Sequence, residues 1–190
     1  MSDPGIRSLG YFLFRYIVVV AKYNLTFGAF TLLMTDVVVT DNTHEGILIA
    51  PSGGASVTGV IRRATLSDDQ SAGTIVDGGS TTGNVDMTIV DTAALGHGRL
   101  GAGFQATSAS GAANTSVYFN NVTINEFSVG VLATNEAIVR MTRLGITRNT
   151  TGVNDSGLTS PGAVYTFGDN DIAGNVTADV SGALTPVSPM

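Results

Sequence analysis

The 190-residue chain contains no cysteine and no tryptophan. Without cysteine there can be no disulfide framework, no thiol catalysis and no zinc site with cysteine ligands. The residues that favour exposed helices are also scarce, since the chain has one Lys, three Glu and two Gln. Helices with alternating Glu and Lys on a solvent face are therefore not expected.

Positive charge is also in short supply. Lys and Arg number 9 against 15 Asp and Glu, so the formal net charge is −6. Proteins that bind nucleic acid carry clustered Lys and Arg, which displace counterions from the phosphates. Here the basic residues are scattered, and Arg62 and Arg63 are the only adjacent pair. We therefore reject nucleic acid as a partner.

The apolar segment near the start of the chain is too short to span a membrane. Residues 9–21 are apolar except for Arg15, which interrupts them, whereas a membrane helix needs about 20 apolar residues. A signal peptide would need a net positive start and a cleavage site between small residues, and the segment has neither. We expect no membrane span and a strand or helix that caps the fold.

The abundant residues indicate many short strands joined by turns. Hydrophobic residues make up 43% of the chain, Gly numbers 24, and Ser, Thr and Asn are plentiful. This composition provides a sizeable core for one domain and is typical of all-β proteins.

An internal repeat is the strongest signal in the sequence. A pattern of apolar, any, polar, apolar, any, apolar residues occurs six times, at spacings of 27, 28, 30, 22 and 26 residues. The first apolar position is occupied by Met34, Ile61, Ile89, Phe119, Met141 and Phe167. The last apolar position is occupied by Val39, Leu66, Ala94, Ile124, Ile146 and Ile172.

Two further positions keep pace with the repeat. Three residues after the last apolar position stand Asn42, Asp69, His97, Phe127, Asn149 and Asn175. Asn and Asp accept the left-handed or bridging backbone conformations that a sharp corner needs, and their side chains can also form hydrogen bonds with nearby backbone groups. A glycine before a mostly apolar or β-branched residue comes next, at Gly46, Gly73, Gly103, Gly130 and Gly152.

This repeat predicts a right-handed parallel β-helix of about six stacked coils. One coil cannot bury its apolar face alone, but stacking places like residues above one another and closes a continuous interior. Strands about 4.8 Å apart would make a rod roughly 29 Å long. A β-sandwich gives no reason for a period near 26 residues, and neither a strict hexapeptide repeat nor a leucine-rich consensus is present.

With these positions aligned, the chain resembles the pectin-lyase-like superfamily of right-handed parallel β-helices, and most closely its uncharacterised bacterial members. The resemblance rests on residues 57–67, 85–95, 117–126, 138–150 and 164–176, and it covers residues 31–176. We expect residues 1–30 to be an irregular apolar segment or cap, and residues 177–190 a flexible tail. The resemblance implies a secreted or cell-surface protein.

A polygalacturonase-like site is the sharpest enzymatic hypothesis. That family is known for an Asp-Asp pair and a Gly-His-Gly motif on neighbouring coils, and this chain has Asp68-Asp69 and Gly96-His97-Gly98, with Asp41 one coil earlier. We expect Asp41, Asp68, Asp69 and His97 to stack on one edge. The family's Arg-x-Lys motif is missing, and the same positions carry Asn in other coils, so a role in turn formation is favoured.

Pectate-lyase chemistry is the second enzymatic hypothesis, because it needs carboxylates that hold Ca²⁺ and a basic residue. Asp36, Asp91 and Asp169 are expected in one column with Arg63, Asn121 and Arg143. Alternating charge in that column is better explained by pairing between coils. We predict no metal site and no cofactor.

Two functions therefore remain open. The first is a non-catalytic β-solenoid that binds polysaccharide or serves as a surface scaffold, and it is the one we favour. The alternative is a polysaccharide-degrading hydrolase or lyase on the same fold.

Overall fold

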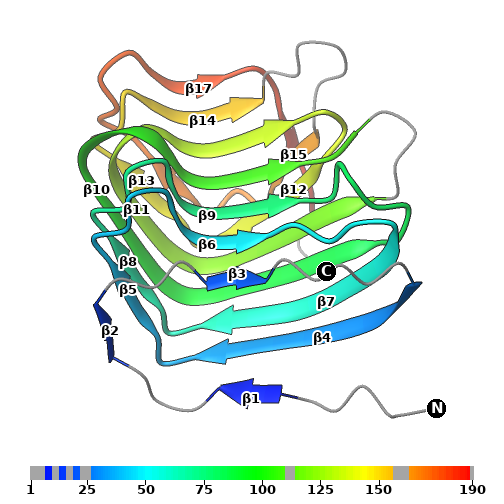
Figure 1. Ribbon diagram of the computed structural model, residues 1–190. Coiled ribbons are helices and arrows are strands. Elements are labelled where there is room, and N and C mark those ends of the chain that lie inside the picture. Colours follow the sequence, from blue (N-terminus) through cyan, green and yellow to red (C-terminus); the bar gives the residue numbers. More distant parts are fainter. Residues whose placement is uncertain are drawn as a thin grey trace.

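The computed structural model describes residues 27–109, 114–155 and 163–188, together with the backbone of three short strands nearer the start of the chain. These residues form an all-β parallel solenoid of about 5 turns (Figure 1). Every strand-to-strand ladder is parallel, and no helix occurs among the described residues. The right-handed sense of the coil and the number of six coils remain predictions.

The wall of the solenoid has three faces, each built from stacked parallel strands (Figure 1). The first face contains β1 (Arg7–Leu9), β4 (Phe27–Thr35), β7 (Gly54–Arg62), β12 (Ile138–Thr142), β15 (Ala163–Thr166) and β18 (Leu184–Pro186). The second contains β2 (Leu13–Arg15), β5 (Val38–Thr40), β8 (Thr65–Ser67), β13 (Gly145–Thr147) and β16 (Asp171–Ile172). The third contains β3 (Val19–Ala21), β6 (Glu45–Ile49), β9 (Ala72–Asp77), β14 (Thr151–Asp155) and β17 (Ala178–Ser181). The long strands β10 (Val85–Thr107) and β11 (Thr115–Thr134) run through all three faces.

The interior of the second face confirms the last apolar position of the repeat. Its six residues align in register from β5 to β16. Five are buried and Ile172 is partly buried. The side chains of a strand alternate between the two faces of the sheet. The short strands β5, β8 and β13 therefore each turn only their middle residue toward the core.

The first apolar position is confirmed for five of its six residues, from Met34 to Met141. Phe167 is an exception, because Thr166 is the residue in register with Met141. The turn after β15 is one residue longer than its counterparts, and Asp169 and Asn170 in it accept hydrogen bonds from the backbone of Arg143 and Leu144. The extra residue places Phe167 one position outside the core column, where it is half-buried.

Residues with positive φ mark two corners in each turn. The first corner carries Asp36, Arg63, Asp91, Asn121 and Arg143, with φ between 50° and 56°. The second carries Asp41, Asp68, His97, Glu126 and Arg148, with φ between 48° and 65°. The left-handed backbone, which the sequence allowed at the Asn/Asp column together with a bridging one, lies one residue before that column except at His97. The preceding residue makes the bend, and the Asn or Asp that follows turns its side chain inward.

A glycine column follows the second corner on the third face. A Cβ on Gly73, Gly103 or Gly130 would lie 2.6, 2.8 or 2.5 Å from the carbonyl oxygen of the glycine in the next turn. Glycine is thus required by close approach of the backbones. The predicted alignment of the residues that follow, from Ile47 and Thr74 to Val153, is confirmed by the register of the third face.

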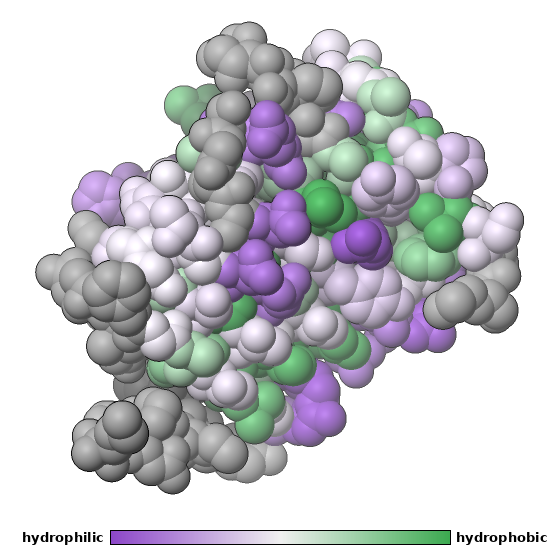
Figure 2. Space-filling model, turned by 90° about the vertical axis from the view of Figure 1, so that its right-hand side faces the viewer, coloured by the Kyte–Doolittle hydropathy of each residue, from purple (hydrophilic) through white to green (hydrophobic). Residues whose placement is uncertain are grey.

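The third corner, where the third face leads back to the first, varies in length and is seen in Figure 2. On this side hydrophobic residues occur in small separate groups between polar ones. One of the short connections joins β11 to β12 through residues 135–137, and Asn135 and Glu136 in it have φ of 53° and 68°.

Strands also occur beyond the limits expected for the solenoid. In the first thirty residues, β1, β2 and β3 pair in parallel with β4, β5 and β6. After residue 176, β17 pairs with β14 and β18 with β15. The predicted cap and tail boundaries remain predictions. No helix among the described residues is long and apolar enough to cross a membrane.

Candidate functional site

The outer edge of the second corner holds most of the sequence-predicted site residues. Asp41, Asp68 and His97 project outward there, and Nδ1 of His97 lies 2.8 Å from Oδ1 of Asp68. Further along the same edge, Arg148 lies 3.2 Å from Glu126 as an ion pair. From turn to turn along this edge, the two carboxylates of Asp41 and Asp68 are followed by His97 and then by the Glu126–Arg148 ion pair.

Asp69 does not join this edge, which corrects the prediction that all four residues stack together. Its side chain points into the solenoid and only 1% of the residue is exposed. Oδ1 accepts hydrogen bonds from the backbone N–H and the side-chain amide of Asn42, at 3.2 and 2.7 Å. Burial raises the pKa of Asp69 to about 6, against the lowering effect of these hydrogen bonds.

The chemical consequence is that the two adjacent carboxylates do not share a cleft. Asp68 and Asp69 leave the chain on opposite sides of the wall, because the positive φ of Asp68 reverses the side-chain direction at the next residue. Cleavage by general acid and base needs both groups to face one substrate. This geometry does not bring Asp69 to the surface that Asp41, Asp68 and His97 occupy.

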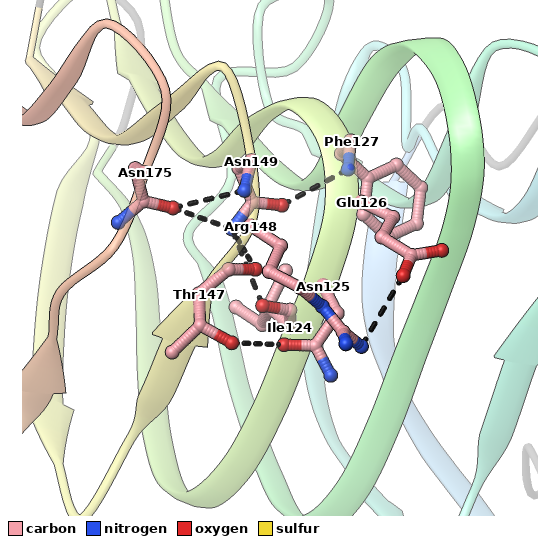
Figure 3. A network of polar contacts seen from close by, with 8 residues as sticks. All are labelled: Ile124, Asn125, Glu126, Phe127, Thr147, Arg148, Asn149 and Asn175. Atoms are coloured by element: carbon pink, nitrogen blue, oxygen red, sulfur yellow. Dashed lines mark hydrogen bonds and ion pairs between the residues drawn. The ribbon is translucent and has the colours of Figure 1, made fainter.

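Behind the edge, the inward Asn side chains form a hydrogen-bonded ladder between turns (Figure 3). The backbone N–H of Phe127 donates to Oδ1 of Asn149 at 3.0 Å. The backbone N–H and Nδ2 of Asn149 both donate to Oδ1 of Asn175 at 3.0 Å. Nδ2 of Asn149 also donates to the carbonyl oxygens of Ile124 and Thr147. The ladder satisfies corner backbone groups that would otherwise be buried without a partner, so its role is structural.

An open hollow of about 310 Å³ lies beside the Glu126–Arg148 pair. Its lining comes from four successive layers of the wall: Gly98, Leu100, Glu126, Phe127, Ser128, Arg148, Thr150 and Val176. Leu100 and Val176 are 91% and 81% exposed. Sequence reasoning did not single out these two residues. The available signal was a single apolar residue between Gly98 and Gly101, and another after the corner Asn175.

The first corner carries the charges expected to pair between coils. Arg63 donates two hydrogen bonds of 2.5 Å to Asp36, and Nδ2 of Asn121 donates to Asp91 at 2.6 Å. The hydrogen bond from Arg63 lowers the pKa of Asp36. These contacts confirm charge pairing between coils for Asp36 and Arg63 and show a hydrogen bond between coils for Asp91 and Asn121. The side chain of Arg143 instead donates to Oδ1 of Asn120, outside this column. Asp169 lies one residue beyond it, since Gly168 takes the positive-φ position.

Over the described residues, no group of three or more His, Asp or Glu side chains is placed to hold a metal ion.

The outward side of the first face presents two tyrosines and an arginine in one row. Tyr118, Arg140 and Tyr165 are in register on β11, β12 and β15. The guanidinium carbon of Arg140 lies 5.5 Å from the ring centre of Tyr165, within cation–π range. Nη1 of Arg140 donates to Oγ of Ser116 at 3.1 Å. All three residues of this row are partly exposed.

Comparison with known proteins adds no relative to this picture. No family model, no curated protein and no solved structure matches the chain. The similarity to pectin-lyase-like proteins therefore remains a hypothesis that rests on the repeat.

Proposed function

We propose that this protein is a non-catalytic β-solenoid that binds polysaccharide, and that it acts outside the cell or at its surface. The observation that carries the proposal is the row of Tyr118, Arg140 and Tyr165 on the first face. We also propose that the chain is a member of the pectin-lyase-like superfamily.

The chemistry of the row suits a sugar chain. A tyrosine ring offers an apolar face to the C–H groups of a sugar ring and a hydroxyl group for hydrogen bonding. Arg140 adds several donors in a planar fork, held in place by Tyr165 and Ser116. Because the three residues stand on adjacent strands, they form a line about 10 Å long across two strand spacings. A linear polymer can follow such a line.

The test is binding of the purified full chain to a panel of soluble neutral and acidic polysaccharides by affinity electrophoresis. Tyr118→Ala and Tyr165→Ala should each weaken retardation by at least about tenfold, because each removes a stacking surface. Val60→Ala is the matched control, because Val60 lies in the same outward row but away from the tyrosines. Binding that is unchanged in both tyrosine variants, or no binding of any polymer by the wild-type chain, would overturn the proposal.

A further inference from the structure

We infer that the corner between β8 and β9 is a pH-sensitive switch, in which Asp69 closes the ladder when it carries a proton and opens it when it is ionised. The switch lies at the second corner and not on the first face, so it does not depend on the proposed polysaccharide binding. What supports it is the place that each carboxylate oxygen of Asp69 takes relative to the asparagines of the same column.

The first oxygen, Oδ1, has the same role as Oδ1 of the asparagines. Oδ1 of Asp69 accepts a hydrogen bond from the backbone N–H of Asn42, the column residue of the preceding turn. In Figure 3, Oδ1 of Asn149 accepts from Phe127 in the same way, and Oδ1 of Asn175 accepts from Asn149. The backbone donor and the oxygen that accepts from it are therefore equivalent at all three positions.

The second oxygen, Oδ2, takes the place of the asparagine nitrogen Nδ2. A Cβ on Gly46, the column glycine of the preceding turn, would meet Oδ2 of Asp69. A Cβ on Gly152, again the column glycine of the preceding turn, would lie 2.7 Å from Nδ2 of Asn175. Both side chains thus turn the same end toward the glycine column, and in aspartate that end is an oxygen.

At the asparagine positions this end of the side chain is a donor. Nδ2 of Asn175 donates to the carbonyl oxygen of Ile146, the last apolar position of the preceding turn, at 3.1 Å. Val39 holds that position in the turn before Asp69. Among the described residues, none donates a hydrogen bond to Oδ2 of Asp69. A proton on Oδ2 supplies the missing donor, so protonated Asp69 reproduces an asparagine, whereas ionised Asp69 leaves a buried acceptor unpaired.

The charges around Asp69 also favour the protonated form. Burial raises the pKa of Asp69 to about 6, and the carboxylates of Asp68 beside it and Asp41 in the preceding turn act in the same direction. The hydrogen bonds from Asn42 act against them and are outweighed. Because the folded pKa lies above the unfolded value of 3.8, the corner is closed in acid and loosens as the pH rises through 6.

Among the described side chains, the other ionisable groups at this corner are less buried than Asp69. His44 is exposed and Glu45 half-buried in the preceding turn, where the carbonyl oxygen of His44 accepts a hydrogen bond from the backbone of Ser71. In the following turn, His97 lies beside Asp68. Histidine gains its charge in acid, so a protonated His97 attracts Asp68 and also favours the closed corner at low pH.

Hydrogen exchange of the full chain, followed by mass spectrometry and corrected for the intrinsic rate at each pH, tests the switch. Residues 66–72 should lose at least about tenfold of their protection between pH 5 and pH 7.5, because each pKa unit is a tenfold change in the opening equilibrium. Residues 146–152, at an asparagine position, should keep theirs. Asp69→Asn should abolish the loss, because Nδ2 is a donor at every pH. His97→Gln should retain most of the loss.

Asn149→Asp moves the switch to a matched position. Asn149 is fully buried, and its Nδ2 donates to the carbonyl oxygen of Ile124. The variant should fold at pH 4.5, where a protonated aspartate can replace asparagine, and should show a new loss of protection in residues 146–152 at pH 7.5. A variant that is unfolded at pH 4.5, or whose protection there does not depend on pH, would contradict the inference.

Two results with the other proteins would overturn the switch. One is protection of residues 66–72 that stays constant with pH in the wild type or that still falls in Asp69→Asn. The other is a loss that disappears in His97→Gln, because the pH dependence would then belong to the surface pair of His97 and Asp68.

Discussion

Asn42 donates two hydrogen bonds to one oxygen of Asp69, and the other oxygen, Oδ2, is buried without a hydrogen-bond partner. Asn175 occupies the same position in the last turn of the column. Its Oδ1 accepts hydrogen bonds from Asn149, and its Nδ2 donates to the carbonyl oxygen of Ile146. An asparagine therefore uses both ends of its side chain in this position. An aspartate in the same position leaves an acceptor unsatisfied, which costs free energy.

The first prediction follows from the raised pKa of Asp69. The folded pKa is about 6 against 3.8 in the unfolded chain, so the folded state holds the proton more tightly. Its contribution to stability is full below about pH 4 and is lost as the pH rises through 6. Asp69→Asn should remove this loss and stabilise the protein at pH 7 by up to roughly 3 kcal/mol, at about 1.4 kcal/mol for each pKa unit.

Urea unfolding of the wild type and Asp69→Asn at pH 4 and pH 7 measures the effect. The two proteins should differ much more at pH 7 than at pH 4. Asp68→Asn is the control, because Asp68 is at the surface beside His97. An equal difference at both pH values would show that the ionisation of Asp69 plays no part.

The second prediction concerns the glycine column. A Cβ on Gly130 would lie 2.5 Å from the carbonyl oxygen of Gly152 and 2.6 Å from Cγ2 of Ile146. Gly130→Ala should therefore destabilise the protein by about 1–3 kcal/mol through overpacking. Gly145→Ala is the matched control, since no heavy atom lies within 4 Å of that Cβ. Thermal melts of the two variants should separate clearly, and equal melting temperatures would contradict the predicted clash.

The third prediction concerns the short turn between β11 and β12. Glu136 is exposed and has a φ of 68°, a conformation in which a Cβ is strained. Glu136→Gly should stabilise the protein by about 1 kcal/mol because glycine adopts positive φ without that strain. Glu136→Ala removes the same charge and keeps the Cβ, so chemical denaturation should show no comparable gain for it. Equal gains for both variants would indicate that the charge, and not the backbone, is responsible.

The parallel solenoid and most of its core could be predicted from the sequence because the same position recurs in every turn. Stacked residues share one environment, so an apolar residue at Val39, Leu66 and Ile124 predicts a buried position at each of them. The prediction failed at Phe167, because the turn after β15 has one additional residue and Thr166 takes the position in register with Met141. A change in turn length leaves no trace in an apolar pattern, since Thr166 and Phe167 both fit a strand.

The candidate site was harder to predict because side-chain direction at a corner depends on one backbone angle. Asp68 and Asp69 are identical in the sequence, yet one is at the surface and the other is 1% exposed. The positive φ of Asp68 determines that Asp68 points outward and Asp69 inward. The exposed Leu100 and Val176 were missed for a related reason. A lone apolar residue in a turn has no equivalent in the other turns, so the repeat does not indicate whether it is buried or exposed.

The last prediction is that the chain does not cleave polygalacturonate, with or without Ca²⁺. Hydrolysis would need two carboxylates, one protonated and one ionised, facing a common substrate at a separation of about 5–10 Å. Asp69 has the raised pKa expected of a general acid, but it faces the interior and is bonded to Asn42. Asp68 is paired with His97 at the surface.

The measurement is release of reducing ends from polygalacturonate, and of unsaturated products by ultraviolet absorbance, by the wild type and by Asp68→Asn. Both proteins should give no more product than a heat-denatured sample. Activity of the wild type that is lost in Asp68→Asn, while the variant keeps its melting temperature, would revive the hydrolase alternative. Because the side chain of Asp68 lies at the exposed edge beside His97, such a loss could not be attributed to damage in the core. Asp69→Asn alone would be a poorer test, since it also changes the stability of the buried ladder.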